Sequence, residues 1–167
     1  MPAAPSRHSR VESPSSGVFT DGACLGNPGP GGWAYAWVVD DEIVAEGAGS
    51  ETRTTNNRME LRALVEAFRR LPADARVSVY SDSKLCVDTL NQWAPRWRER
   101  GWRRKGGPIA NLDLVRELYD LAAARPGASL RWIKAHAGAR WNEYVDAQAS
   151  RRASLARDFP ARGSSPG

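Results

Sequence analysis

Four acidic residues, Asp21, Glu60, Asp82 and Asp146, stand where a charged side chain needs an explanation. Asp21 closes the expected first strand of the chain, and Asp82 directly follows the expected fourth strand. If these two strands are parallel neighbours, both carboxylates lie at the carboxyl edge of the sheet, where α/β proteins bind their ligands. Each aspartate alone is equally compatible with a turn residue or a helix N-cap, because both are common at strand ends.

Glu60 falls on the apolar face of an expected helix, because Leu64 and Phe68 follow it four and eight residues later. A carboxylate on a packed face is costly unless it is paired or bound to a metal ion. The alternative is a capping box, since Asn57 stands three residues before Glu60. The spacing of these residues does not separate a ligand from a cap.

Asp146 shows the same pattern, with Ala149 and Ala153 on its side of the last expected helix. The alternative is an acid in the first helical turn, which the helix dipole favours. Four gathered carboxylates cannot all stay ionised without cations, and hard divalent ions such as Mg²⁺ prefer oxygen ligands. Two such ions ~3.5–4 Å apart activate a water and stabilise the leaving oxygen in phosphodiester cleavage. The acids therefore predict a metal-dependent nuclease.

The elements that must position these acids follow from apolar periodicity and turn residues. Strands are expected at residues 17–21, 33–39, 43–50, 76–81 and 129–133, and helices at 57–71, 83–90, 112–123 and 142–157. The first three strands are joined by short connections, which favours an antiparallel meander. The later strands alternate with helices, which favours parallel crossovers. The expected fold is an α/β mixed five-stranded sheet flanked by helices, over residues 17–157, with disordered tails at 1–16 and 158–167.

The net charge of +5 is concentrated in one stretch of the chain. Residues 96–105 contain six basic residues and one acid, which equals the excess of the whole chain. A concentrated basic patch favours a polyanionic partner such as a nucleic acid. No apolar run is long enough for a membrane span or a secretory signal, so a cytoplasmic location is expected. The two cysteines and two histidines are scattered and form no zinc-binding pattern.

Four sequence segments resemble a known family. They are FTDGACLGNPGPGG at residues 19–32, TRTTNNRMEL at 52–61, SDS at 81–83, and KAHAG at 134–138 followed by Asn142, Glu143 and Asp146. In this order and spacing they resemble bacterial type 1 ribonuclease H over about residues 17–157. The resemblance implies a ribonuclease H-like fold and hydrolysis of the RNA strand of an RNA–DNA hybrid. The implied products carry 3′-hydroxyl and 5′-phosphate ends.

The resemblance also implies the roles of individual residues. The implied metal ligands are Asp21, Glu60, Asp82 and Asp146, and His136 assists proton transfer or product release from a loop. The implied substrate-binding residues are Cys24, Asn27, Thr55, Asn56, Asn57, Ser83, Lys84, Trp93, Trp97, Arg98, Arg100, Trp102, Arg103 and Asn142. The implied cofactor is Mg²⁺, as two ions that Mn²⁺ can replace, and the implied enzyme is a monomer.

Three tryptophans interleave with five arginines: Trp93, Trp97 and Trp102 with Arg96, Arg98, Arg100, Arg103 and Arg104. This stretch resembles the basic protrusion of the family, which binds the DNA strand. The alternative is a solvated helix with Trp93 and Trp97 packed inward, four residues apart. Three residues depart from the family pattern: Lys84 replaces a common Gln, Ala135 a Gly, and Trp141 an often acidic residue. Another nuclease of the same superfold, or a hybrid-binding module without catalysis, remains an alternative at this stage.

Overall fold

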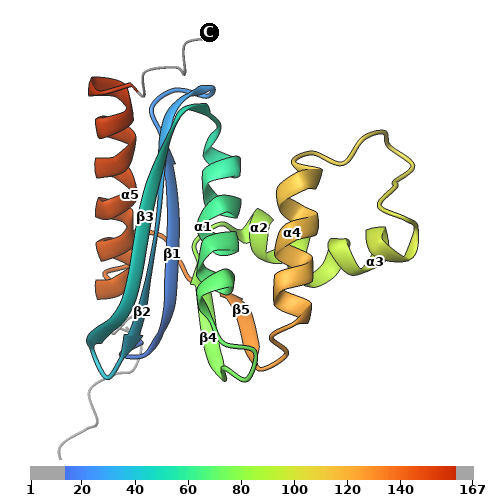
Figure 1. Cartoon of the computed structure of the whole chain (residues 1–167), viewed down its shortest axis with the longest axis horizontal. Helices are drawn as coiled ribbons and strands as arrows, with labels where there is room; N and C mark the ends of the chain where they lie inside the picture. Colours follow the sequence, from blue (N-terminus) through green and yellow to red (C-terminus); the bar gives the residue numbers. More distant parts are fainter. Residues whose placement is uncertain (1–13, 161–167) are drawn as a thin grey trace, which may run out of the picture.

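The computed structural model describes residues 14–160 and contains a mixed five-stranded sheet (Figure 1). Three antiparallel strands come first: β1 (Gly17–Cys24), β2 (Gly29–Val39) and β3 (Glu42–Thr54). β4 (Val77–Ser81) then pairs parallel to β1, and β5 (Ala128–Trp132) pairs parallel to β4. The resulting order, β3-β2-β1-β4-β5, confirms the predicted mixed α/β sheet.

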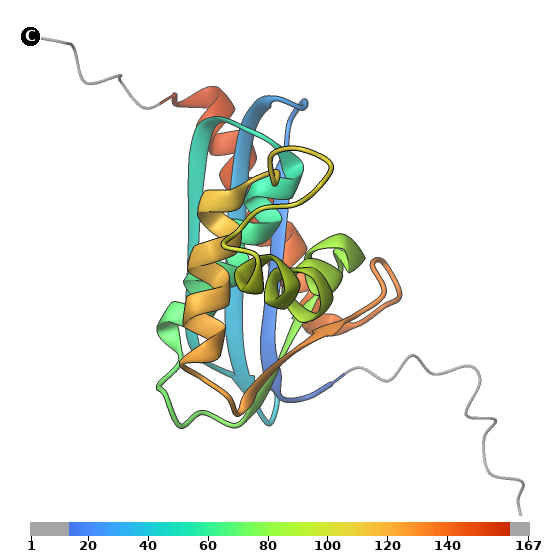
Figure 2. The same ribbon diagram turned by 90° about the vertical axis from the view of Figure 1, so that its right-hand side faces the viewer.

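Helices cover both faces of this sheet (Figures 1 and 2). α5 (Arg140–Asp158) packs on one face, and α1 (Asn56–Arg70) packs on the other with α4 (Leu112–Ala123) against it. Between β4 and α4 the chain forms three short helices that extend away from the sheet. They are α2 (Lys84–Asp88), the π-helical turn η1 (Thr89–Trp93) and α3 (Ala94–Glu99).

Each face of the sheet has its own apolar core, because successive strand residues point to opposite sides. Val18 packs with Leu64, Phe68 and Leu118 on the α1 side. The next residue, Phe19, packs on the α5 side in a cluster that includes Ala36, Val145 and Ala149. The two cores fix α1 and α5 on opposite sides of β1, the strand that carries Asp21.

Two glycines let the helices approach the sheet closely. A Cβ on Gly22 would lie 2.4 Å from the main-chain nitrogen of Glu60 in α1. A Cβ on Gly32 would lie 2.3 Å from the main-chain oxygen of Ala149 in α5. Since any larger residue would clash with helix backbone, these glycines set how near the two helices come to β1 and β2.

The strands differ from the sequence prediction mainly in length. Asp21 does not end β1, because antiparallel pairing with β2 continues from Asp21 opposite Ala34 to Cys24 opposite Gly31. Residues 29–32 fall between the first two expected strands, and their turn-forming glycines and proline favour a loop, but they belong to β2 because they pair with β1 and β3. The predicted helix at 83–90 is divided between α2 and the π-helical turn η1. Pro95, which has no main-chain N–H to donate, follows this turn at the start of α3.

The chain enters the sheet beside the turn between β2 and β3. The main-chain N–H of Asp41 donates to the carbonyl of Ser15, and that of Asp40 donates to the hydroxyl of Ser16. Of the expected tails, residues 1–13 and 161–167 lie outside the described residues. Within residues 14–160, no helix combines the length and apolarity needed to cross a membrane.

Candidate active site

Three of the predicted acids meet where β1 and β4 part. Parallel pairing between these strands ends at Phe19 opposite Tyr80, so Asp21 lies just beyond it on β1, and Asp82 directly follows β4. One carboxylate oxygen from each of Asp21, Glu60 and Asp82 lies within 4.8 Å of the others. Asp21 is 3% exposed and Glu60 is 6% exposed. The sheet therefore brings together charges that water cannot fully screen.

Glu60 reaches the cluster from the buried face of α1, and it takes no part in capping that helix. The N-cap is Thr55, whose hydroxyl accepts a 3.2 Å hydrogen bond from the N–H of Arg58. The capping-box alternative, with Asn57 as the cap, is therefore wrong. Within residues 14–160, Glu60 Oε2 is buried without a hydrogen-bond partner. A buried carboxylate oxygen without a donor is what a metal ligand looks like before the cation is bound.

The pKa values of the three acids are raised because burial and mutual repulsion disfavour their charged forms. Burial, followed by the charge of Asp82, raises the pKa of Asp21 to about 8. Burial and then the charges of Asp21 and Asp82 raise the pKa of Glu60 well above its usual range. Burial also raises the pKa of Asp82, with repulsion from Asp146 second. A divalent cation would relieve this repulsion, and the all-oxygen donor set fits a hard ion.

Asp146 and His136 complete the site from the other side. Both line the same hollow of about 410 Å³ as the three clustered acids. The Asp146 side chain contacts that of Asp21, and burial raises the pKa of Asp82 although the nearby imidazole of His136 lowers it. His136 (φ +53°) and Gly138 (φ +84°) give the loop between β5 and α5 its left-handed turns. The structure thus gathers all five residues predicted to be catalytic.

Several predicted substrate-binding residues surround this hollow. Asn56, Asn57 and Ser83 line it, and Asn27 accepts a 3.2 Å hydrogen bond from the main-chain N–H of Asn56. Lys84 is exposed beside Ser83. Two other members of the predicted set lie differently: the thiol of Cys24 points at the carbonyls of Gly29 and Thr54, and Asn142 is 3% exposed at the start of α5.

The family model described as RNase H matches residues 14–154. The chain belongs to the ribonuclease H family. It is 42% identical over 135 residues to the ribonuclease H of Alcanivorax borkumensis, covering 80% of this chain and 88% of that one. It is 41% identical over 152 residues to the ribonuclease H of Phenylobacterium zucineum, covering 90% and 98% of the two chains. These findings confirm the predicted ribonuclease H, a hydrolase and endonuclease.

Solved ribonucleases H have the same fold as this chain. LC9-RNase H1, a type 1 ribonuclease H with the type 2 active-site motif, is 35% identical with a TM-score of 0.71, covering 87% of this chain and 74% of that one. The N-terminal ribonuclease H domain of a Mycobacterium tuberculosis protein is 26% identical with a TM-score of 0.64, covering 86% and 98%. The family and the fold agree with the site built from the residues.

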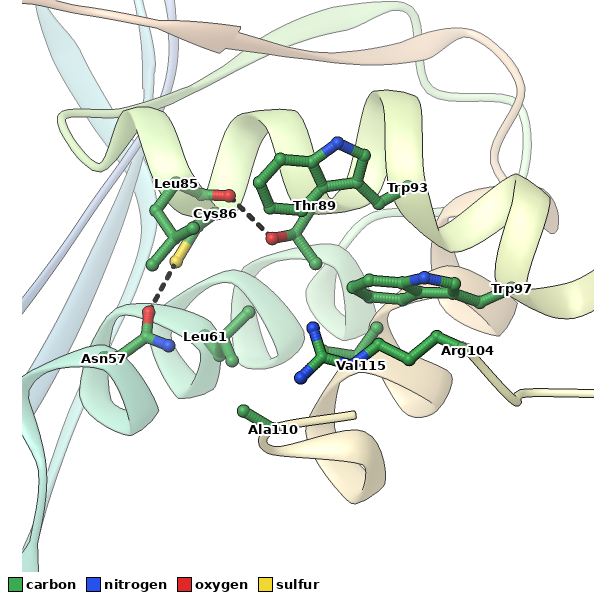
Figure 3. Close-up of a pocket in the computed structure, with 10 residues that line it drawn as sticks. All are labelled: Asn57, Leu61, Leu85, Cys86, Thr89, Trp93, Trp97, Arg104, Ala110 and Val115. Carbon is green, nitrogen blue, oxygen red and sulfur yellow. Dashed lines mark hydrogen bonds between the residues drawn. The ribbon is translucent and has the colours of Figure 1, made fainter. Parts of the chain in front are cut away.

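Beside the acidic site this ribonuclease H carries a second hollow of about 380 Å³ (Figure 3). Asn57 and Leu85 line both hollows, so the two adjoin. Trp93 and Trp97 form one wall, with ring centroids 6.1 Å apart, and the thiol of Cys86 donates to the side-chain oxygen of Asn57 at 3.3 Å. Figure 3 shows Arg104, which the sequence analysis did not assign to substrate, reaching in beside Trp97.

The basic protrusion, residues 93–111, is anchored on α4 by aromatic contacts. Trp102 meets the ring of Tyr119 edge-on at 5.6 Å, and the guanidinium of Arg98 lies 5.8 Å from the same ring. Arg116 of α4 lies in turn 5.5 Å from the ring of Trp102. Trp102 and Arg98 therefore contact α4, whereas Arg100 and Arg103 line an open depression together with Arg104 and Lys105.

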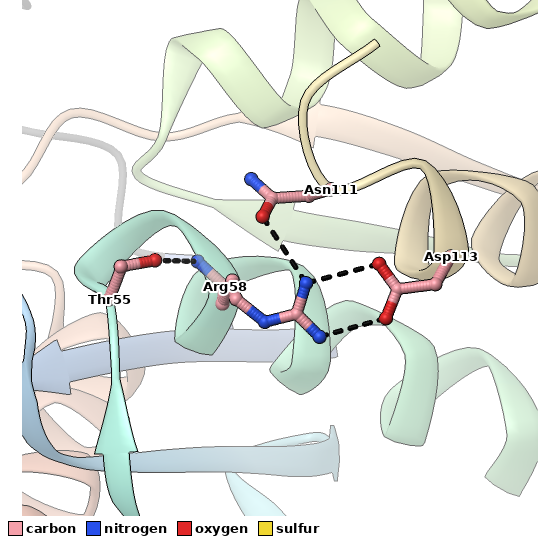
Figure 4. Close-up of polar contacts among 4 residues, drawn as sticks. All are labelled: Thr55, Arg58, Asn111 and Asp113. Carbon is pink, nitrogen blue, oxygen red and sulfur yellow. Dashed lines mark hydrogen bonds and ion pairs between the residues drawn. The ribbon is translucent and has the colours of Figure 1, made fainter. Parts of the chain in front are cut away.

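An ion pair joins the N-terminal ends of α1 and α4 (Figure 4). Arg58 binds both carboxylate oxygens of Asp113, at 3.0 and 2.8 Å, and its Nη1 donates to Asn111 Oδ1 at 3.2 Å. Asn111 adopts a left-handed conformation (φ +55°) directly before α4. The pair links Thr55 and Asn57 on one helix to the end of the protrusion on the other. The helical motif around Arg58 was recognised in the sequence, but its distant partners were not.

Proposed function

We propose that Asp21, Glu60, Asp82 and Asp146 hold divalent cations, Mg²⁺ in the cell, in a catalytic domain over residues 17–157. The observation that carries the proposal is the buried Glu60 oxygen without a donor, within 4.8 Å of carboxylate oxygens from Asp21 and Asp82. Bound cations would supply Lewis-acid stabilisation of the phosphate and a more acidic water. Mn²⁺ can replace Mg²⁺ because both are hard ions that accept oxygen ligands.

The reaction at this site is hydrolysis of the RNA strand of an RNA–DNA hybrid. A water oxygen forms a bond to phosphorus while the bond from phosphorus to the 3′-oxygen breaks, which leaves a 3′-hydroxyl and a 5′-phosphate. The protein aligns the strand through Asn56 and Asn57, whose amides can recognise the 2′-hydroxyl that distinguishes RNA from DNA. His136 moves a proton at the leaving oxygen or helps the product to leave, because its loop lines the same hollow.

The second hollow and the protrusion take the DNA strand. Trp93 and Trp97 offer apolar ring surface for sugars, and Arg100, Arg103 and Arg104 neutralise phosphates. Because the two hollows adjoin at Asn57 and Leu85, one chain can hold both strands of a hybrid. We therefore propose a monomeric enzyme. We also propose that it acts in the cytoplasm, where the free thiols of Cys24 and Cys86 stay reduced.

The proposal is tested by incubating labelled RNA–DNA hybrid, double-stranded RNA and double-stranded DNA with the protein, with Mg²⁺ or with a chelator. We expect cleavage of the RNA strand of the hybrid alone, only with Mg²⁺, and with 3′-hydroxyl and 5′-phosphate products. Cleavage of all three substrates would contradict the assigned substrate. Cleavage that persists in the chelator would contradict the metal site.

A further inference from the structure

The main chain that carries Asp82 leaves the sheet where its pairing with β1 stops. The parallel register joins Val18 to Val79 and Phe19 to Tyr80, and the described pairing goes no further. Ser81 and Asp82 therefore have no strand partner on the β1 side. The main chain of Asp82 therefore depends on contacts outside the β1–β4 pairing to stay in place.

Three successive carbonyls, from the last residue of this pairing onward, each accept a hydrogen bond. The hydroxyl of Thr20 donates to the carbonyl of Tyr80 at 2.9 Å. The main-chain N–H of Ile133 donates to the carbonyl of Ser81 at 2.9 Å. The indole N–H of Trp132 donates to the carbonyl of Asp82 itself at 3.2 Å. Two of the three donors are side chains, one from each strand that flanks β4.

Both side chains direct their hydrogen-bond donor at the main chain of β4 or of the residue that follows it. Thr20, the residue just before Asp21, is 1% exposed, and its hydroxyl donates to the neighbouring strand β4. Trp132 is 49% exposed, so its ring adds little to the core, yet its N–H is fixed on Asp82. A half-exposed tryptophan whose donor binds the main chain of an acid is better explained by alignment of that acid than by packing.

We propose that Thr20 and Trp132 are positioning residues that align Asp82 from both sides of β4. The inference rests on the proposed function, because it assumes that Asp82 binds a cation together with Asp21 and Glu60. An aspartate has only two side-chain torsions, so the place of its carboxylate follows the place of its main chain. A productive site needs its ligands held within about 0.5 Å. Loss of either hydrogen bond should weaken the cation site without disturbing the hollow for the DNA strand.

The test uses Thr20→Val, which keeps the shape and removes the hydroxyl, and Trp132→Phe, which keeps a ring and removes the N–H. Thr20→Ser restores the hydroxyl, and Trp37→Phe removes an indole that packs against the core on the α1 side. Mn²⁺ binding is measured by calorimetry on each protein without hybrid, and kcat and KM are measured on the hybrid. Thermal unfolding of each variant is followed in parallel.

For Thr20→Val and Trp132→Phe we expect Mn²⁺ affinity and kcat to fall about 10-fold, at the low end of losses for groups that orient a metal ligand. KM for the hybrid should stay within about twofold of the wild type, because the strand-binding residues keep their places. Thr20→Ser and Trp37→Phe should behave like the wild type. Trp132→Phe should fold normally, since the ring is half exposed.

Unchanged Mn²⁺ affinity and kcat in Trp132→Phe would overturn the inference, even if Thr20→Val failed to fold. A raised KM with unchanged metal affinity would also overturn it, because Trp132 would then act on the substrate. Thr20→Ser as impaired as Thr20→Val would assign Thr20 to packing and remove it from the proposal. If the wild-type protein neither bound Mn²⁺ nor cut the hybrid, the proposed function itself would fail, which is a distinguishable result.

Discussion

At the scale of single residues, the charge of Asp21 opposes folding when no cation is bound. Burial raises its pKa from 3.8 to about 8, so the folded state holds a proton that the unfolded chain releases near pH 4. The free energy of unfolding should therefore fall as pH rises from about 4 to about 8 in a chelator. Asp21→Asn removes this charge, and we expect it to stabilise the metal-free protein at pH 8 by about 1–3 kcal/mol.

Thermal unfolding of both proteins in EDTA at pH 4 and pH 8 checks this expectation. Mg²⁺ should raise the melting temperature of the wild type and leave that of Asp21→Asn nearly unchanged, and the variant should lose hydrolysis of the hybrid. A lower melting temperature for Asp21→Asn than for the wild type at pH 8 in EDTA would contradict this expectation. Full activity in the variant would remove Asp21 from the metal site.

Sequence patterns predicted which side chains would gather, but not how each would be oriented. Asp21, Asp82 and Glu60 could be predicted together because strand ends and helix faces have fixed geometry. The cap of α1 could not be settled, since Thr55 and Asn57 both suit that role and only the local backbone decides. The thiol of Cys24 turns to main-chain carbonyls, a contact that depends on the β2–β3 pairing.

At the scale of helices and strands, the site depends on how closely α1 lies against β1. A Cβ on Gly22 would lie 2.4 Å from the nitrogen of Glu60, so Gly22→Ala must push α1 away from the sheet. We expect a loss of about 1–3 kcal/mol in the free energy of unfolding, as overpacking in a tight core usually costs. Mn²⁺ affinity should fall as well, because Glu60 moves with its helix.

Denaturant unfolding and Mn²⁺ calorimetry measure the two effects. Gly106→Ala is the matched control, since a Cβ there meets nothing within 4 Å. If Gly22→Ala unfolds at the same denaturant concentration as the wild type, the approach of α1 to β1 is not as tight as described. Loss of stability with unchanged Mn²⁺ affinity would show that the close packing of α1 on β1 does not position Glu60 for the cation.

The limits of β1, β2 and β3 show why elements are harder to predict at their ends than in their middles. The run Asp21-Gly22 suggests the end of a strand, yet pairing with β2 carries β1 on to Cys24. Glycines at 29, 31 and 32 suggest a turn, yet they pair within the sheet. Long-range pairing overrides local turn propensity here, and a single sequence does not contain that pairing explicitly.

At the scale of the whole molecule, the sequence predicted a basic surface for nucleic acid, but it did not separate the arginines that line an open depression from the residues that anchor the protrusion on α4. Arg98 and Trp102 contact Tyr119 of α4, whereas Arg100, Arg103 and Arg104 line an open depression. The two groups interleave in the same short stretch of sequence, and only the fold of the protrusion onto α4 distinguishes them. The protrusion and α5 lie on opposite sides of the molecule (Figure 1).

This arrangement predicts which arginines govern the salt dependence of hybrid binding. Each phosphate contact that is lost should flatten the slope of log K against log salt by about 0.7–0.9. We expect Arg100→Gln with Arg103→Gln to weaken binding and flatten the slope by nearly two such steps, and Arg98→Gln to change it less. Binding of a labelled hybrid to Asp21→Asn protein, titrated at several salt concentrations, measures the slopes without cleavage.

Arg151→Gln with Arg152→Gln, on exposed residues of α5, makes the same change in net charge and should leave the slope unaltered. Equal slopes for the two double variants would mean that net charge alone, and not the protrusion, attracts the hybrid.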